Sequence, residues 1–506
     1  MRATEVASRP RPLPHECRTS AAAFPRAPGP SCRAAGIISQ NARSVDGKES
    51  PSRNVRYFLL ASRLSFVADY KIVGANLSDD RKRWATLCLA IVVSATIIYQ
   101  AAKLSLAWYW DSSGETDKQI RAATLTPGNA QVWAELGQAS QFSFDETKPD
   151  RAISYYLRAV HANPLSAAHW IVLADAYEAT GDMTRASEAY ENAKRDYPIS
   201  GDVAWKYGNF LLRQAQTTQG LSEIHRALLN DPKLTALAIR SVWNFEPDVN
   251  LILDHLLPSD EDADFAALDF FVGVHQIQPA LETWQRIVPL SRERPIELKR
   301  TFAFLDELIT QDRADDAQQV WRAALEGSRW PVAAPIDHSI VWNGGFETPI
   351  ANGGLDWRVE QRPGAYTSLD AAVHHSGAQS LRVGFTGGVN LEFVQVFQIE
   401  PAQPNTAYDF QAFVRTEGIS TDSGVHFEIF DPQREPQVYV LTPNIVGSMP
   451  WTPVRAVVST SPLSHFLEIR LHRFPSRLFD SKISGTIWVD DVTLVKKTVV
   501  SGHPKP

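Results

Sequence analysis

The sequence predicts a multidomain chain: a disordered tail and one transmembrane helix, followed by an all-α solenoid of helical repeats and an all-β sandwich. Three observations support this prediction. An apolar run without charge interrupts a polar N-terminal region, and one helix-pair pattern then recurs at a fixed spacing. After Trp330 the pattern changes to short alternating strands separated by Gly, Pro and Asn. At 506 residues the chain exceeds what one hydrophobic core usually organises, so several folded units are expected.

Charge is distributed unevenly along the chain. Basic residues outnumber acidic ones up to Arg83, whereas acidic residues predominate afterwards and set the net charge of -7. An acidic body argues against nucleic acid as a partner, because phosphate neutralisation needs clustered Lys and Arg. The three cysteines, Cys17, Cys32 and Cys88, all lie in or before the apolar run. This distribution fits an oxidising compartment, and a general scarcity of cysteine explains it equally well.

Residues 1–80 are predicted to form a disordered basic tail. They are rich in Pro, Arg, Ser and Ala up to Arg53 and show no sustained hydrophobic period. Two interpretations stay open. The stretch is a cytoplasmic tail that touches anionic lipid, or the true start lies downstream and residues 1–50 are not part of the mature protein.

A transmembrane helix is predicted over residues 84–106. The run from Trp84 to Ala102 carries no charge, and at ~1.5 Å per residue it is about 28 Å long, enough to cross a bilayer. Three basic residues, 81–83, precede the run and three aromatic residues, 108–110, follow it. This pattern predicts a cytoplasmic N-terminus and C-terminal domains in the periplasm. The alternative is a signal peptide cleaved near Ala107, which would release a secreted protein.

One helix-pair pattern recurs every 34 residues after this run. The recurring positions are Ala159, Ala193 and Ala227, and Pro164, Pro198 and Pro232. The second unit adds Trp170, Tyr177, Gly181 and Tyr190. The pattern resembles the tetratricopeptide repeat, in which aromatic residues mark the first helix, small residues lie where helices cross, and Pro closes the unit.

The array is predicted to cover residues 119–330 in about six helix pairs. From Leu234 the helical period continues without the repeat consensus, as expected of atypical terminal repeats. Gly220 replaces the small Ala of the third unit, and extra residues near 144–149 lengthen the turn of the first. The resemblance implies a scaffold whose concave surface binds a protein partner.

A β-sandwich is predicted over residues 337–497, after a linker at residues 332–335. Alternating runs such as YDFQAFV, VHFEIF and FLEIRL are typical of antiparallel strands. The region resembles galactose-binding-like jelly-roll domains of the type found as carbohydrate-binding modules. The resemblance rests on Asn343 to Glu347, Trp357, Gly377, Ser380 to Val383, Tyr408, Phe413 to Arg415, Trp451 and Trp488 to Leu494. It implies a glycan ligand.

The last strand places a carboxylate on an apolar side. Strict alternation puts Asp490 on the same face as Trp488, Val492 and Leu494, where an unpaired charge is unfavourable. The resemblance implies a structural calcium ion held by Glu347 with Asp490 or Asp491. The alternative is a carboxylate that accepts hydrogen bonds from backbone amides.

Glycan recognition needs aromatic faces and planar polar groups. By family position Trp357 and Trp488 are expected in the core, so they are not candidates. The candidate ligand-binding residues, expected at the surface or in a cleft, are Tyr366, Phe393, Arg415, Tyr439, His472 and Phe474.

The sequence therefore favours a membrane-anchored, extracytoplasmic adaptor. Its array would bind a protein and its sandwich a glycan, in assembly or export of a cell-envelope polysaccharide. The alternative is a protein-protein scaffold without a carbohydrate ligand. An enzyme is not expected, because phosphate loops and hydrolase motifs are absent from the sequence. The pair His374-His375 is expected in a solvated turn with no carboxylate nearby.

Overall fold

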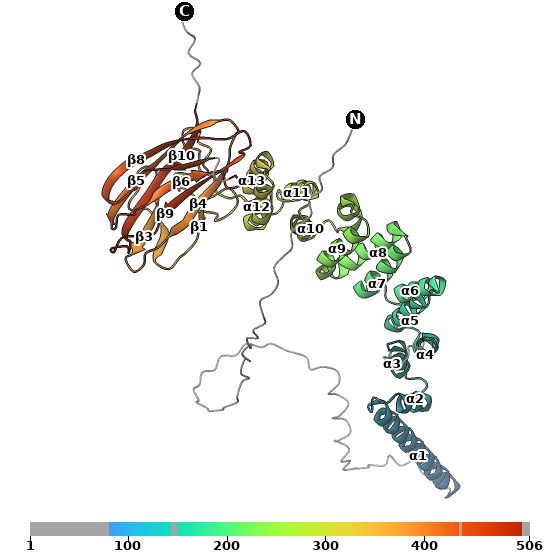
Figure 1. The fold of residues 1–506 in the computed structure, drawn as a ribbon. Helices are drawn as coiled ribbons and strands as arrows, with labels where there is room; N and C mark the ends of the chain where they lie inside the picture. Colours follow the sequence, from blue (N-terminus) through green and yellow to red (C-terminus); the bar gives the residue numbers. More distant parts are fainter. Residues whose placement is uncertain (1–79, 143–148, 435–437, 498–506) are drawn as a thin grey trace, which may run out of the picture. The chain divides into compact units, whose positions relative to one another are not determined.

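The computed structural model describes residues 80–142, 149–434 and 438–497. Nearly all of the predicted tail, and most of the lengthened turn in the first repeat, lie outside the described residues. The predicted order of architectures is confirmed: one apolar helix, an all-α array and a two-sheet β-sandwich follow one another along the chain (Figure 1).

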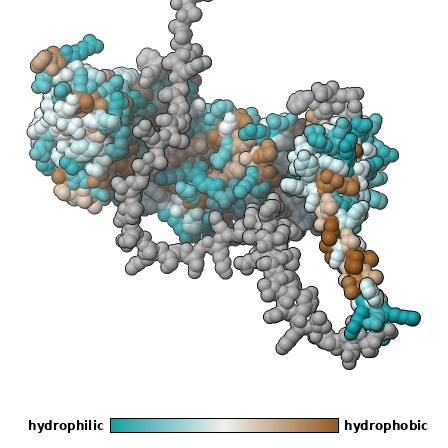
Figure 2. All heavy atoms as spheres, turned by 90° about the horizontal axis from the view of Figure 1, so that it is seen from below, coloured by the Kyte–Doolittle hydropathy of each residue, from teal (hydrophilic) through white to brown (hydrophobic). Residues whose placement is uncertain are grey.

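The apolar run forms the middle of helix α1 (Asp80–Asp111), which is longer at both ends than the predicted span of 84–106. The helix has 32 residues and contains an 18-residue window with a mean hydropathy of 1.9, so it is long and apolar enough to cross a membrane, a test that a signal sequence also passes. Figure 2 shows apolar residues along its middle and polar residues at its end. The helix continues through Ala107, which is buried in an apolar cluster with Ala122 and Trp133.

The array consists of a leading helix, α2 (Thr116–Leu125), and six pairs, as the repeat spacing predicts. The pairs are α3 (Ala130–Gln141) with α4 (Pro149–Ala162), α5 (Ala167–Ala179) with α6 (Met183–Asp196), α7 (Gly201–Arg213) with α8 (Thr217–Asn230), α9 (Thr235–Phe245) with η3 (Leu251–Leu256), α10 (Glu261–Gly273) with α11 (Ile277–Leu290), and α12 (Phe302–Thr310) with α13 (Ala314–Ser328). Short 3₁₀ turns, η2 (Pro232–Leu234) and η4 (Leu298–Thr301), precede α9 and α12. The segment η3 is π-helical, so the fourth pair departs from the regular repeat.

The residues of the repeat pattern perform the same contacts in successive units. The indole N–H of Trp133 donates to the carbonyl of Pro127 at 3.1 Å, and that of Trp170 donates to Pro164 at 2.8 Å. In the third unit, α7 and α8 cross at Gly208 and Gly220. A Cβ on Gly208 would lie 2.9 Å from the carbonyl oxygen of Gly220, so glycine is required for this close approach.

The sandwich packs two five-stranded antiparallel sheets face to face. The strands are β1 (Arg358–Val359), β2 (Ala365–Asp370), β3 (Ser380–Thr386), β4 (Phe393–Pro401), β5 (Ala407–Ile419), β6 (His426–Phe430), β7 (Tyr439–Leu441), β8 (Gly447–Ser459), β9 (Phe466–Arg473) and β10 (Ser484–Lys496). Sheet A has the order β1-β4-β9-β6-β7 and sheet B the order β2-β3-β10-β5-β8. Figure 1 shows β5, β8 and β10 in one layer and β4, β6 and β9 in the other.

A β-bulge interrupts the inward-outward alternation of side chains on the last strand, β10. The register of β10 against β5 shifts between Asp490 and Thr493, and Asp491 adopts a φ of 45°. Val492 therefore joins the core, whereas Trp488 lies on the outer face of sheet B. The prediction that these two residues share one face is wrong, because the bulge reverses the phase of the strand.

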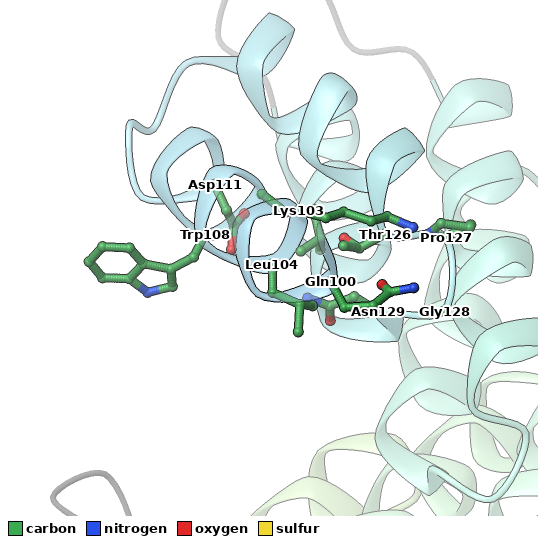
Figure 3. Close-up of a pocket in the computed structure, with 11 residues that line it drawn as sticks. Gln100, Lys103, Leu104, Trp108, Asp111, Thr126, Pro127, Gly128 and Asn129 are labelled. Carbon is green, nitrogen blue, oxygen red and sulfur yellow. The ribbon is translucent and has the colours of Figure 1, made fainter. Parts of the chain in front are cut away.

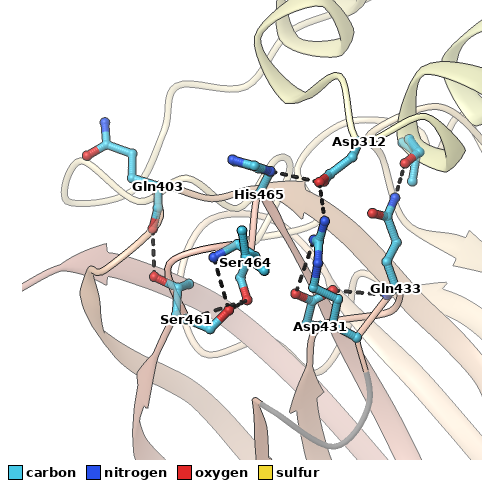
Figure 4. Close-up of polar contacts among 11 residues, drawn as sticks. Asp312, Gln403, Asp431, Gln433, Ser461, Ser464 and His465 are labelled. Atoms are coloured by element: carbon cyan, nitrogen blue, oxygen red, sulfur yellow. Dashed lines mark hydrogen bonds and ion pairs between the residues drawn. The ribbon is translucent and has the colours of Figure 1, made fainter.

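The last repeat of the array packs against the outer face of sheet A. Phe466 of β9 and Leu355 belong to the same apolar cluster as Trp321 of α13. Asp312, in the turn between α12 and α13, accepts hydrogen bonds from Arg434 at 2.6 Å and from His465 at 2.8 Å (Figure 4). Burial alone would raise the pKa of Asp312, but these bonds and charges hold that pKa below its usual value. An apolar contact and an ion pair thus join the array to the sandwich.

Candidate functional site

Polar side chains gather on the outer face of sheet A, on two neighbouring strands. Alternate residues of β6 and β9, such as Phe427, Ile429 and Ile469, face the core, so the residues between them face outward. The outward residues meet in three cross-strand pairs: His426 with His472, Glu428 with Arg470, and Phe430 with Glu468. Together with Phe474 these six residues are here named the outer patch.

Ionisable groups of the outer patch are linked to one another. The carboxylate of Glu428 lies 2.8 Å from Nδ1 of His472 and 3.7 Å from Nη1 of Arg470. Nε of Arg470 also donates to Glu468 at 2.8 Å. Burial raises the pKa of Glu468, while the guanidinium of Arg470 acts in the opposite direction. These contacts hold the planar, hydrogen-bonding groups in fixed positions. Glu428, Glu468 and His472 are buried, whereas His426, Arg470 and Phe474 are partly exposed.

One polar atom of the outer patch has no hydrogen-bond partner among the described residues. Nε2 of His472 is buried, and its nearest charged neighbour is Glu392 at 3.8 Å. The ring of Phe474 lies over His472, with centroids 3.9 Å apart, and His426 approaches Phe474 edge-on at 5.8 Å. An aromatic face thus lies beside an unsatisfied ring nitrogen and a paired carboxylate.

Arg473 lies directly beneath the outer patch and is completely buried. Its guanidinium donates to the carbonyls of Leu391, Ser423 and Ser481 and to Oδ1 of Asn390. Burial lowers its pKa, and the nearby Asp422 opposes this effect. The side chain thereby ties three loops together beneath the patch.

The six residues predicted to bind glycan divide among three places. His472 and Phe474 lie in the outer patch, and Tyr439 pairs with Phe430 at its edge. Tyr366 and Arg415 lie on the opposite, outer face of sheet B. The prediction that Phe393 lies at the surface is wrong. Phe393 is 1% exposed and packs on Phe385 in the core.

The outer face of sheet B carries alternating arginine and aromatic side chains. The guanidinium groups of Arg382 and Arg415 lie 5.8 and 5.6 Å from the ring of Trp488. Tyr366 stands beside Arg382 and is 43% exposed. Trp488 is buried as predicted, but beneath arginine side chains rather than inside the core.

The three carboxylates predicted to hold calcium all contact one loop. Asp490 accepts hydrogen bonds from the backbone N–H of His375 at 2.7 Å and of Ser376 at 3.2 Å. Asp491 contacts the imidazole of His375 at 2.6 Å, so the prediction that no carboxylate lies near this histidine is wrong. Glu347 accepts from the backbone N–H of Ala378 at 2.9 Å.

The groups around these carboxylates are backbone N–H donors and the side chains of His375 and Ser376. Amide donors satisfy the carboxylate of Asp490, as in the alternative raised from the sequence, and calcium needs six to eight oxygen ligands. No cluster of three or more His, Cys, Asp or Glu able to hold a metal occurs within residues 80–142, 149–434 and 438–497. Calcium binding stays a prediction.

A cavity of about 690 Å³ lies between the end of α1 and the connection from α2 to α3. Lys103 extends toward Thr126 and Pro127, whereas Trp108 points away from that connection (Figure 3). Lys103 is the first charged residue after the apolar run. The cavity combines polar and apolar lining at the end of the apolar segment.

On the first-helix side of the array, charged residues pair between repeats. Lys206 donates to Asp175 at 2.8 Å, and Arg213 binds Glu178 through two hydrogen bonds of 2.6 and 2.8 Å. These pairs link the second and third units. They also neutralise the charges that could otherwise clamp a ligand on this surface.

We expect stability to fall as pH rises, because of a buried carboxyl in the sandwich. Burial raises the pKa of Asp356 to about 7, although the N–H groups of Ala351 and Trp357 donate to it. This pKa exceeds the value of ~3.9 in the unfolded chain. The stabilising contribution of the protonated group is therefore fully present below about pH 4 and is lost as the pH rises through about 7. Losing this contribution completely lowers the free energy of unfolding by about 4 kcal/mol.

Thermal melts at several values between pH 4 and pH 8 would measure this dependence. Asp356→Asn should reduce the slope of melting temperature against pH, whatever its effect on absolute stability. The buried Glu400, whose pKa burial also raises, leaves a residual slope of the same sign. An unchanged slope in the variant would show that Asp356 does not titrate in this range.

Sequence reasoning missed Glu428, Arg470, His426 and Glu468. The signal was present in the strands HFEIF and FLEIRLHR, where His, Glu and Arg occupy every second position between apolar residues. Such alternation places the polar residues on one face. That these side chains lie next to one another depends on the pairing of β6 with β9, which the sequence alone does not give.

The fold defines a chain that joins a tetratricopeptide-type helical array to an antiparallel β-sandwich. No protein-family model matches the sequence, and no curated protein matches it. Among solved structures, the TPR protein YrrB, described as having an unusual peptide-binding site, is 14% identical with a TM-score of 0.22. That match covers 42% of this chain and 94% of YrrB.

Two further structures resemble the sandwich. TmCBM61, solved in complex with β-1,4-galactotriose, is 12% identical with a TM-score of 0.23, over 31% of this chain and 99% of its own. The CBM22-1–GH10 modules of Clostridium thermocellum xylanase 10B, complexed with xylohexaose, are 15% identical with a TM-score of 0.24. That match covers 34% of this chain but only 30% of the xylanase chain. Each match is a likeness of fold over one part of the chain.

Proposed function

We propose that this protein is a membrane-anchored, extracytoplasmic adaptor. Its sandwich binds a glycan through the outer patch, and its helical array binds a protein partner. The role is in assembly or export of a cell-envelope polysaccharide. The proposal assigns no catalytic step to the chain.

The composition of the outer patch is the observation that supports glycan binding by the sandwich. Sugars offer hydroxyl groups and apolar C–H faces, so a binding site needs fixed planar donors and acceptors beside an aromatic ring. Arg470 and Glu428 supply the planar groups, and Phe474 supplies the ring.

The protein-binding half is supported by exposed apolar residues at equivalent positions of the array. Leu165 is 80% exposed and Ile199 is 66% exposed, and they lie one repeat of 34 residues apart. Each follows the proline that closes a unit. Exposed large apolar side chains that gather on one surface are a feature of protein interaction sites.

Retention of the membrane anchor is supported by α1. The helix runs without interruption through Ala107, the residue at the alternative cleavage site, and Ala107 packs with Trp133 of α3. Cleavage there would remove most of α1 and expose part of this cluster. The basic residues before the apolar run favour a cytoplasmic N-terminus.

The glycan half predicts that the full-length protein in detergent is retarded by a polysaccharide in affinity electrophoresis. Phe474→Ala and Arg470→Ala should each weaken retardation by about 10-fold or more, since each removes a direct contact. Arg415→Ala is the matched control, because Arg415 lies on the outer face of the other sheet. Thermal melts would confirm that all three variants fold.

Two outcomes would contradict this assignment. If Arg415→Ala alone lost retardation, the glycan-binding site would have to be assigned to the outer face of sheet B. The absence of retardation by any acidic or neutral polysaccharide, with calcium and with a chelator, would favour the alternative of a purely protein-binding scaffold. Pull-downs with the full chain carrying Leu165→Asp and Ile199→Asp would then test that alternative.

A further inference from the structure

A second, smaller cavity lies at the junction between the array and the sandwich. It has a volume of about 240 Å³ and is lined by α13, by the connection into the sandwich and by the end of β4. Its apolar walls include Val341, Leu355 and Trp342. Its lining shares no residue with the outer patch, so the two are separate sites.

One residue that lines the cavity has a buried hydrogen-bond donor without a partner. Trp321 is 2% exposed, and its indole Nε1 has no hydrogen-bond partner among the described residues. A buried N–H left unpaired is destabilising, and such groups are normally satisfied by protein, water or a ligand. The ring of Trp342 stands edge-on to Trp321, with centroids 6.1 Å apart, and forms a second aromatic wall.

A buried carboxyl group lines the same cavity. Glu400 is almost fully buried, and its Oε1 accepts a hydrogen bond from the backbone N–H of Trp342 at 2.7 Å. Burial raises the pKa of Glu400 well above its usual value, which favours its protonated, neutral form. A neutral carboxyl group both donates and accepts hydrogen bonds, as a hydroxylated ligand requires.

The rim of the cavity carries a positive charge. Arg322 follows Trp321 on α13, lines the cavity and makes no ion pair with any described residue. A guanidinium suits a carboxylate because two parallel hydrogen bonds can form between them. The arrangement places a cation at the opening, hydrogen-bonding groups inside and apolar walls around them.

We propose that this junction cavity binds one hexuronate ring. The carboxylate of the sugar pairs with Arg322, its hydroxyls bond to Nε1 of Trp321 and to Glu400, and its C–H face lies against Trp342. The volume suits a single ring and excludes a peptide helix or an oligosaccharide chain. A ligand in this position touches both α13 and the sandwich, so it stabilises their contact.

Isothermal titration of the full-length protein in detergent with glucuronate, glucose and acetate tests the proposal. Glucuronate should bind at least 10-fold more tightly than glucose, which lacks the carboxylate, and acetate should not bind measurably. Arg322→Ala should weaken glucuronate binding by about 10-fold or more. Trp321→Phe, which removes the N–H, should weaken it by several-fold.

Arg240→Ala is the control, because Arg240 is an exposed arginine of α9 outside the cavity lining. Glucuronate binding that survives Arg322→Ala, or the absence of binding in the parent protein, would overturn the proposal and leave a water-filled cavity. The test uses a monosaccharide and a different set of variants from the polysaccharide test. Failure of one therefore leaves the other standing.

Discussion

Replacing Arg473 by methionine is expected to lower the free energy of unfolding of the sandwich by about 3 to 5 kcal/mol. The guanidinium is fully buried and donates hydrogen bonds to Asn390, Leu391, Ser423 and Ser481. Methionine fills a similar volume but removes all four hydrogen bonds. Asn390 keeps a bond from the N–H of Ser476 and Ser423 keeps one from Thr421, so the loss falls mainly on the carbonyls of Leu391 and Ser481. Each buried polar group left without a partner costs about 1 to 3 kcal/mol, so losing the only bonds of two such groups makes a large effect.

Equilibrium unfolding in urea would measure this loss, with Arg477→Met as the control. Arg477 is exposed, lies four residues further along the chain and takes part in none of these hydrogen bonds. The control should change stability by less than about 0.5 kcal/mol. A stable Arg473→Met variant would mean that the surrounding carbonyls find other partners, and that the outer patch does not depend on this side chain for support.

Gly344→Ala is expected to destabilise the sandwich by about 3 kcal/mol or more and to reduce the yield of folded protein. A Cβ at this position would lie 2.0 Å from the carbonyl oxygen of Val492 and 3.1 Å from its carbonyl carbon. The two backbones are also joined by a hydrogen bond of 2.9 Å from the N–H of Val492 to the carbonyl of Gly344. Backbone cannot yield as a flexible side chain can, so the bulged strand must shift.

The neighbouring glycine supplies a matched control for this substitution. A Cβ on Gly345 would meet its nearest atom, in the side chain of Ile336, at 3.4 Å, which is ordinary contact. Gly345→Ala should therefore leave the denaturation midpoint nearly unchanged. Similar midpoints for the two alanine variants would show that the loop is free to move away from Val492.

The contact between the last repeat and sheet A limits which parts of the sandwich can bind a ligand. Phe466 and Ile399 lie under α12 and α13, so this end of the outer face is covered by the chain itself. The polar residues of the outer patch lie further along the same strands. The junction cavity and the outer patch are therefore formed by different parts of one sheet.

The candidate site could be predicted in part. His472 and Phe474 were identified as candidates because they combine a planar polar group with an aromatic ring next to a strand. The face on which each strand residue lies was less predictable. Bulges on β4 and β10 reverse the phase of alternation. Phe393 precedes the first of these shifts and lies inside the core.

Residue spacing by itself determined the apolar helix, the six helix pairs and the β-sandwich. These features follow from local periods of hydrophobicity, which are set by helix and strand geometry and need no knowledge of distant contacts. The repeat pattern also identified Pro164 and Trp170, which are joined by a hydrogen bond in the structure. The order of the elements along the chain was therefore readable before the structure.

Only the tertiary structure decided which residues meet. The pairing of β6 with β9 placed Glu428 beside Arg470 and His472, and the loop at His375 satisfied Asp490 where calcium had been expected. The packing of α13 on sheet A enclosed Trp321 and Glu400 in one cavity. Such contacts join residues far apart in sequence, and they depend on strand register and bulges that local periodicity does not encode.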